Sequence, residues 1–308
     1  MVLQASDAGF GVMLPSFDSC GLGHPFKLLP GARLAEELDF DTGWVGDHLA
    51  YYPPTLDALC AASAAAAVTE RLNIGTGILL LPMRNPVWTA KQVATVGSLA
   101  PDRFFFGVGV GGEGKEEFEA AGYSTARRGA RLDESLQVVD ALLRGLPVDH
   151  SGPEMTVRSP ALAPVPPAHP PLIVGGRSYA ALRRTARVGD GWLGVWMDTP
   201  RFRRSIETLG ELAEDFGRPR PTVIFMVFVN VTDDETAGRT QATWFIKGQY
   251  GLPFEALERW VVIGPEAKVA ANLAEFQDAG AEGFVMVTAS PDPLNQYERL
   301  AKVRALLD

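Results

Sequence analysis

The sequence predicts an α/β protein built as a (β/α)8 (TIM) barrel with insertions in its βα loops. Short β-rich runs alternate with helical stretches, which is the pattern of βα units around a parallel sheet. The length of 308 residues fits one barrel of this kind, which takes roughly 250 residues before insertions. An open, doubly wound sheet is the alternative. Because no second type of composition appears, we expect a single domain over residues 1–308.

The predicted strands are runs rich in β-branched, aromatic and glycine residues, bounded by turn-forming residues. They lie at residues 10–14, 42–46, 72–78, 103–109, 172–176, 191–195, 222–229 and 283–287.

Helices are predicted in the segments between these strands. Pro86 suits the first turn of a helix, where a missing N–H group costs nothing. The spacing of Leu132, Leu136, Val139 and Leu143 gives one apolar stripe at helical period. The remaining helices are expected at 30–38, 55–68, 200–216 and 265–280, after Ser178, and at the end of the chain.

Two segments do not follow the simple alternation. Residues 146–171 hold eight prolines and are predicted to be an extended connection, since the alternation resumes directly after them. Residues 232–260 are polar and mixed, and we expect an insertion there with helices of its own.

The composition excludes several classes of function. A net charge of −9 and a pI near 5.1 give no attraction to nucleic acid or to anionic membranes. We find no apolar run of about 20 residues and no signal-peptide pattern, so a cytoplasmic protein without membrane partners is expected.

Cysteine usage and motifs argue against metal and disulfide chemistry. The two cysteines, Cys20 and Cys60, form neither a disulfide framework nor a zinc motif. Cys20 is interpreted as a small loop residue, with a reactive thiol as the alternative, and Cys60 as helix packing. HExxH, CxxC and P-loop motifs do not occur, so no metal site is predicted.

The carboxyl ends of the strands are where a barrel of this kind builds its active site. The second strand ends in Asp47 and His48, and an imidazole suits proton transfer near neutral pH. We therefore interpret His48 as a catalytic residue with Asp47 beside it, against the alternative of a structural histidine.

Two glycine-rich junctions follow other strands. Gly175, Gly176, Arg177 and Ser178 stand between a strand and a helix, where backbone N–H groups and the helix dipole favour a phosphate. An ordinary turn is the alternative there. The run from Gly109 to Gly112 lacks the G-x-G-x-x-G spacing, so it is interpreted as a flexible loop beside a cofactor.

Together these stretches resemble the bacterial luciferase-like superfamily, and within it the coenzyme F420-dependent oxidoreductases. The match runs in order along nearly the whole chain. It lies at residues 44–49, 72–78, 84–92, 102–111, 116–122, 171–176, 189–192, 264–266 and 278–280.

The resemblance implies roles for several residues. Asp47 and His48 would stand near the flavin-type ring and the substrate. A non-prolyl cis peptide between Gly77 and Ile78 would support the ring. The loop with Gly109 and Gly111, and the segment Gly175, Gly176, Arg177 and Ser178, would flank the ribityl phosphate of the cofactor.

The same resemblance favours F420 over FMN. Many F420 relatives carry Asp-His where Asp47 and His48 stand, whereas several FMN monooxygenases carry Glu-His. FMN luciferases often have an arginine in the loop where this chain has Val110. Glu113 matches an acidic position of some F420 dehydrogenases, although an extra glycine precedes it. Arg84, Lys115 and Arg177 are candidate cations for the acidic tail of F420.

The leading hypothesis is therefore hydride transfer between F420 and a small organic substrate. The alternative is an FMN-dependent monooxygenase that uses O2 and reduced FMN supplied by a flavin reductase. A flavin-binding barrel without catalysis is the third. Many relatives are dimers, which implies a homodimer. Aromatic residues suggest an apolar or aromatic substrate, with ordinary packing as the alternative; they are Phe17, Phe26, Trp244, Phe245, Tyr250 and Phe254.

Overall fold

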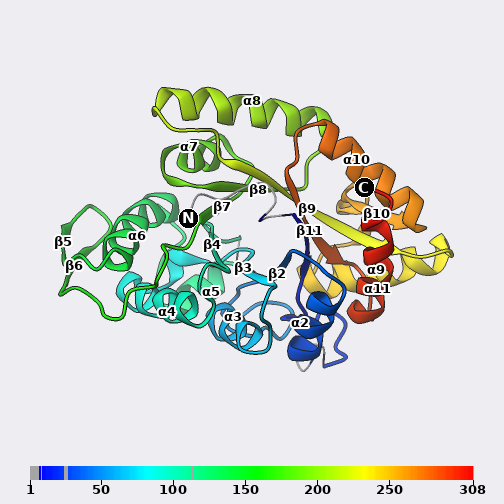
Figure 1. The fold of residues 1–308 in the computed structure, drawn as a ribbon, viewed down its shortest axis with the longest axis horizontal. Coiled ribbons are helices and arrows are strands. Elements are labelled where there is room, and N and C mark those ends of the chain that lie inside the picture. Colours follow the sequence, from blue (N-terminus) through cyan, green and yellow to red (C-terminus); the bar gives the residue numbers. More distant parts are fainter. Residues whose placement is uncertain (1–6, 8, 24–26, 113, 308) are drawn as a thin grey trace.

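The computed structural model describes residues 7, 9–23, 27–112 and 114–307, and it confirms the closed parallel barrel (Figure 1). The barrel closes because β1 pairs with both β2 and β11, while β9 pairs with both β8 and β11. In order around the barrel its strands are β1 (Phe10–Met13), β2 (Thr42–Val45), β3 (Asn73–Thr76), β4 (Phe104–Val108), β7 (Leu172–Gly175), β8 (Gly191–Val195), β9 (Thr222–Val231) and β11 (Gly283–Thr288).

Helices surround the barrel, and side-chain caps define where several of them begin. Asn85, directly before Pro86, accepts hydrogen bonds from the N–H groups of Val87 and Trp88, and Asp57 caps its helix in the same way. The helices are α2 (Leu28–Glu37), α3 (Ala58–Ala66), α4 (Pro86–Leu99), α5 (Lys115–Ala120), α6 (Arg128–Leu143), α7 (Tyr179–Val188), α8 (Thr199–Asp215), α9 (Glu235–Tyr250), α10 (Glu266–Asp278) and α11 (Pro293–Arg304).

The interior of the barrel is a packed core. Its central layer consists of buried residues from six strands, Trp44, Phe105, Ile173, Leu193, Ile224 and Val285. Gly75 leaves room for the Trp44 ring, since a Cβ at that position would lie 2.4 Å from an indole carbon. Met13, Ile78 and Met226 pack on this layer, so a solid floor separates the upper end of the barrel from the lower end.

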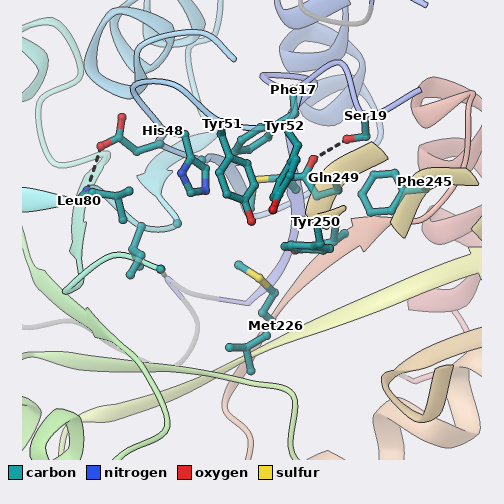
Figure 2. Close-up of a pocket in the computed structure, with 18 of the residues that line it drawn as sticks. Phe17, Ser19, His48, Tyr51, Tyr52, Leu80, Met226, Phe245, Gln249 and Tyr250 are labelled. Atoms are coloured by element: carbon teal, nitrogen blue, oxygen red, sulfur yellow. Dashed lines mark hydrogen bonds between the residues drawn. The ribbon is translucent and has the colours of Figure 1, made fainter. Parts of the chain in front are cut away.

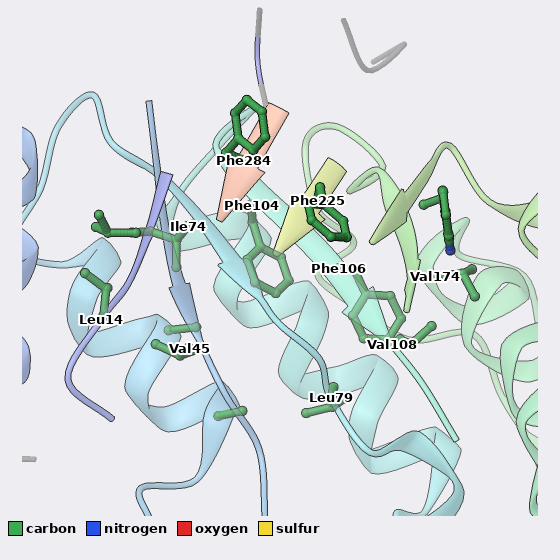
Figure 3. Packing of buried hydrophobic residues seen from close by; sticks show 14 of the residues in the cluster. Leu14, Val45, Ile74, Leu79, Phe104, Phe106, Val108, Val174, Phe225 and Phe284 are labelled. Atoms are coloured by element: carbon green, nitrogen blue, oxygen red, sulfur yellow. The ribbon is translucent and has the colours of Figure 1, made fainter. Parts of the chain in front are cut away.

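A second core lies between the strands and the helices (Figure 3). In β4 the side chains alternate, with Phe105 in the barrel interior and both Phe104 and Phe106 in the outer cluster. The strands are thus buried on both faces, which explains why they appear in the sequence as nearly continuous apolar runs.

Three details differ from the sequence expectations. The proline-rich segment contains an antiparallel hairpin, β5 (Val148–Ser151) and β6 (Thr156–Ser159). A ninth parallel strand, β10 (Val261–Gly264), pairs with the second half of β9. Cys60 is exposed, because the buried face of α3 carries Leu59, Ala61 and Ala62 and turns Cys60 toward solvent. The prediction that Cys60 packs in the helix interface was therefore wrong.

The expected helices of residues 232–260 are present. They are α9 and two short 3-10 turns, Phe254–Ala256 and Glu258–Trp260. Within the described ranges, no helix has the length and hydropathy that a membrane span requires.

Candidate active site

A cavity of about 580 Å³ opens at the carboxyl ends of the barrel strands, directly above the Met13, Ile78 and Met226 floor (Figure 2). Five of the predicted site residues line it, so the fold brings them together at one place. They are Asp47, His48, Gly77, Ile78 and Gly111.

His48 is held by a buried carboxylate that the sequence did not single out. Its Nδ1 lies 3.0 and 3.1 Å from the two carboxylate oxygens of Glu117, on α5. The His48 ring also stacks on Tyr51, with 3.7 Å between ring centroids. A carboxylate at Nδ1 selects the tautomer with its hydrogen on that nitrogen, so Nε2 is left for proton exchange.

Asp47 is engaged by the protein itself. Its carboxylate accepts hydrogen bonds from the backbone N–H of Leu80 at 2.9 Å and from Arg84 at 2.7 Å. Arg84 donates equally closely, at 2.7 Å, to Asp57 at the start of α3. Asp47 is therefore placed to hold the loop after β3 against the end of β2.

The peptide bond between Gly77 and Ile78 is cis, as expected. The Ile78 side chain packs between two of the predicted glycines, Gly109 and Gly175. A Cβ on Gly109 would lie 1.8 Å from Ile78 Cδ1, and one on Gly175 would lie 2.8 Å from Ile78 Cγ2. These two glycines thus make room for a residue of the cavity wall, and neither lines the cavity itself.

The segment from Gly175 to Ser178 lies at the β7–α7 junction, outside the cavity lining. Ser178 accepts a hydrogen bond from the N–H of Ala181 and caps α7. Arg177 packs over the ring of Trp196, 5.5 Å from its centroid, and Trp196 does line the cavity. The predicted phosphate cradle therefore borders the cavity through Trp196.

The three cations predicted for an acidic cofactor tail are placed differently. Arg84 already forms ion pairs with Asp47 and Asp57. Lys115 pairs with Glu119 on the exposed face of α5, and Arg177 stacks on Trp196 as described. Arg128, which was not among the predicted cations, lines the cavity and donates to the carbonyl of Gly112 at 2.6 Å.

Segments predicted to shape the substrate site meet on the other side of the cavity. The Ser19 hydroxyl donates to Gln249 at 2.5 Å, which joins the loop after β1 to α9. Of the aromatic candidates, Phe17, Phe245 and Tyr250 line the cavity, whereas Trp244 is exposed and Phe254 is buried. Phe26 and Glu113 lie outside the described residues.

Cys20 has the surroundings of an unreactive thiol. It is buried, and this burial, together with the nearby Asp18 charge, raises its pKa to about 11. Among the residues that the structure describes, no group of three or more His, Cys, Asp or Glu side chains is arranged to hold a metal ion.

Comparison with known proteins places this architecture in a family. The sequence model of the luciferase-like monooxygenase family matches residues 10–256. An F420-dependent glucose-6-phosphate dehydrogenase of Microbacterium testaceum is 28% identical over 293 residues, which cover 90% of this chain and 84% of that protein.

Solved structures share the fold, among them a dehydrogenase and a monooxygenase. An F420-dependent secondary alcohol dehydrogenase, in complex with an F420-acetone adduct, superposes with a TM-score of 0.87 at 20% identity and covers 98% of this chain and 99% of that one. The monooxygenase RslO1 from Streptomyces bottropensis gives a TM-score of 0.84 at 20% identity and covers 97% and 98%. The chain therefore belongs to the bacterial luciferase-like family and is a flavin- or deazaflavin-dependent oxidoreductase.

Proposed function

We propose that this chain moves a hydride between coenzyme F420 and a small organic alcohol or carbonyl compound. The observation that carries the proposal is the pairing of His48 with Glu117 on the wall of a closed-bottomed cavity. Interconversion of an alcohol and a ketone moves one proton together with each hydride, so the site needs a group that exchanges a proton. His48 Nε2 is the atom that this arrangement leaves for that task.

The residues present fit a deazaflavin. A volume of about 580 Å³ falls in the range of cofactor and ligand pockets, roughly 300–1,000 Å³. Gly112 lines the cavity, and apart from its chain neighbours no described residue lies within 4 Å of the place that a Cβ would take there, so its backbone is open to the cavity. Gly77, Ile78 and Leu80 would lie against the ring, and Arg128 would meet the anionic chain.

The segment Gly175–Ser178 remains our proposal for the phosphate, since the start of α7 offers N–H groups beside the cavity. When bound, F420 supplies the hydride acceptor or donor. In the oxidative direction His48 takes the hydroxyl proton of the substrate at Nε2, and in the reductive direction it returns that proton. Glu117 keeps the ring oriented throughout, and Asp47 acts as a positioning residue through Arg84 and Leu80.

F420 is favoured over FMN by the relatives that match most of the chain. The F420-dependent glucose-6-phosphate dehydrogenases of Microbacterium testaceum and Nocardia farcinica align over 90% and 92% of it. The monooxygenase RslO1 shares the fold at 20% identity, the same identity as the F420-dependent alcohol dehydrogenase, so the solved structures do not discriminate between the two cofactors. An FMN-dependent monooxygenase with a partner reductase is the second candidate, supported by that shared fold.

Titration of the purified protein with F420 and with FMN, at low and at moderate salt, tests the proposal. We expect F420 to bind, and its affinity to fall as salt rises, because screening weakens contacts between its acidic tail and exposed cations. The Arg128→Gln variant should bind F420 more weakly and with a smaller salt dependence. The exposed Arg158, on β6, supplies the matched control Arg158→Gln. Binding of FMN without F420, with oxygen uptake on supplying reduced FMN, would establish the monooxygenase instead.

A further inference from the structure

The cavity has two chemically different sides. Three of the described lining residues have ionisable acidic or basic side chains, and all three lie on the side of β2 to β4. They are Asp47, His48 and Arg128. The opposite side is formed by the ends of β8, β9, β11 and β1 together with α9. We call this side the apolar chamber and define it by Met13, Trp196, Met226, Phe245, Tyr250 and Val287.

Trp196 has an unusual backbone conformation for so large a residue. It follows directly after β8 with a φ of +53°, in the left-handed region that non-glycine residues rarely adopt. Such a conformation persists only where the surroundings hold it, and it is common at functional sites. Here it brings the indole into the cavity wall.

Contacts on several sides fix the Trp196 ring. Arg177 lies over it, 5.5 Å from its centroid, and donates to the Trp196 carbonyl at 3.4 Å. Tyr250 meets it edge-on at 5.3 Å, and Phe228 lies at 6.1 Å. The ring is therefore a rigid wall, and the residues around it determine the width of the chamber.

The polar side chains on this side of the cavity are hydroxyl and amide groups, which carry no formal charge; they are Ser19, Gln249, Tyr250, Thr288 and Ser290. Gln249 is bonded to Ser19. Burial raises the pKa of the Tyr250 phenol, so this group stays uncharged. A phosphate placed on this side would lose its hydration without gaining a cationic partner among the described residues that line the chamber, since Arg128 lies on the opposite side, and this is strongly unfavourable.

We propose that Trp196 is a specificity-determining residue and that the chamber selects an uncharged alcohol or ketone with a hydrocarbon-ring body. The oxygen of that substrate faces His48, and its ring packs on Trp196 and Met226. The inference rests on the proposed function for the reacting group, but it concerns the body of the substrate. The proposed substrate differs from that of the relatives called glucose-6-phosphate dehydrogenases, because the chamber would exclude the dianionic phosphate of glucose 6-phosphate.

Calorimetric titration with cyclopentanone, cyclohexanone, cycloheptanone and cyclooctanone tests the inference. The protein is first loaded with the oxidised form of whichever cofactor it binds, so that no turnover occurs with a ketone. Affinity should rise about fourfold for each added methylene until the chamber is full. With glucose 6-phosphate we expect neither binding heat nor reduction of the cofactor. Affinity that does not depend on ring size, or binding of glucose 6-phosphate as tight as that of cyclohexanone, would refute the proposal that the chamber selects a hydrocarbon ring.

The Trp196→Gly variant removes the wall and keeps a residue suited to a positive φ. Its affinity for cyclooctanone should fall at least tenfold, and Trp196→Phe should lose less. Cofactor affinity is measured separately for each variant, because Arg177 packs on Trp196. Trp88→Ala, at an exposed tryptophan on α4, is the matched control and should change none of these values. Unchanged ketone affinity in both Trp196 variants would refute the specificity role. Failure of F420 to bind would refute the proposed cofactor alone, because the ketone titrations use whichever cofactor binds.

Discussion

At the scale of single residues, the proposed chemistry depends on how one imidazole is held. His48 has Glu117 on one ring nitrogen and Tyr51 on one ring face, so its remaining nitrogen has a fixed direction. A second histidine of the chain, His150, is paired with Glu134 at 3.0 Å but does not line the cavity. The two pairs have the same N–O distance, although His48 uses Nδ1 and His150 uses Nε2, so His150 is a control for the effect of histidine–carboxylate pairing away from the cavity.

We expect His48→Ala to reduce turnover of a ketone or alcohol substrate roughly 10²–10⁴-fold, with cofactor affinity nearly unchanged. Glu117→Gln should lower kcat by a similar factor, because an amide can donate to Nδ1 and so favour the wrong tautomer. Steady-state kinetics and cofactor titration provide the two readouts. His150→Ala and Glu134→Gln are the matched controls and should retain parental kcat. A parental kcat in folded His48→Ala would exclude the proton-transfer role.

The sequence made His48 predictable, because it is the histidine that directly follows a predicted barrel strand. Glu117 was not predictable in the same way. It stands among Glu113, Glu116 and Glu119 in one short stretch, and only packing decides which carboxylate is buried. Trp196 gave no signal either, since the sign of φ at a tryptophan cannot be inferred from residue type.

At the scale of elements, Arg84 joins three segments of the active-site face. It follows a short 3-10 turn, Leu81–Met83, and bonds the end of β2 through Asp47 and the start of α3 through Asp57. The side chain of Asp47 is 1% exposed, and Arg84 is its cationic partner. Coulombic attraction and hydrogen bonding from Asp47 and Asp57 outweigh the effect of burial and raise the pKa of Arg84.

Arg84→Met should therefore lower the free energy of unfolding by about 3–5 kcal/mol, since it leaves a buried carboxylate without a cation. The double variant Arg84→Met with Asp47→Asn should recover part of this loss. Urea-induced unfolding measures both. Arg158→Met, at an exposed ion pair with Asp149, should change the free energy by about 1 kcal/mol or less. If Arg84→Met lowered the free energy of unfolding no more than this control, the packing of the three segments would not depend on Arg84.

Elements were predictable where their apolar pattern was long, as in the eight barrel strands. The hairpin β5–β6 was not, because its two four-residue strands are polar and half-exposed and lie among prolines. Strand β10 was missed because four residues between a mixed helical segment and Pro265 give no clear period. In both cases tertiary pairing supplies what local propensity does not.

At the scale of the whole molecule, two carboxylates held in ion pairs make folding sensitive to acid. The hydrogen bond from Arg299 holds the pKa of Glu266 at about 2, and this pair joins α10 to α11. His169 and Arg144 lower the pKa of Asp140 to about 2 as well. Because both values are lower in the folded than in the unfolded chain, the two carboxylates stabilise the fold above about pH 4.5, and this contribution is lost as pH falls toward 2.

The double variant Asp140→Asn with Glu266→Gln should melt below the parent at pH 7, and the difference should shrink steadily between about pH 4.5 and pH 2. The difference should also be modest, because both pairs are partly solvated. Thermal unfolding followed by circular dichroism at several pH values measures it. Glu298→Gln, at an exposed position on α11, is the control. A difference in melting temperature that stays constant from pH 7 to pH 3 would show that these carboxylates do not carry the acid sensitivity.

Strand β9 has a consequence for how this enzyme could acquire new substrates. Its first half pairs with β8 up to Met226, and its second half pairs instead with β10 from Phe228 onward. The sheet therefore branches beside the apolar chamber, where β9 pairs first with β8 and then with β10. The His48 side of the cavity is built on strands β2 to β4, which do not branch. We expect changes in the length or sequence of the branched part to alter which molecules are accepted, and to leave proton transfer and cofactor binding intact. One half of the pocket can therefore diverge while the other stays constant.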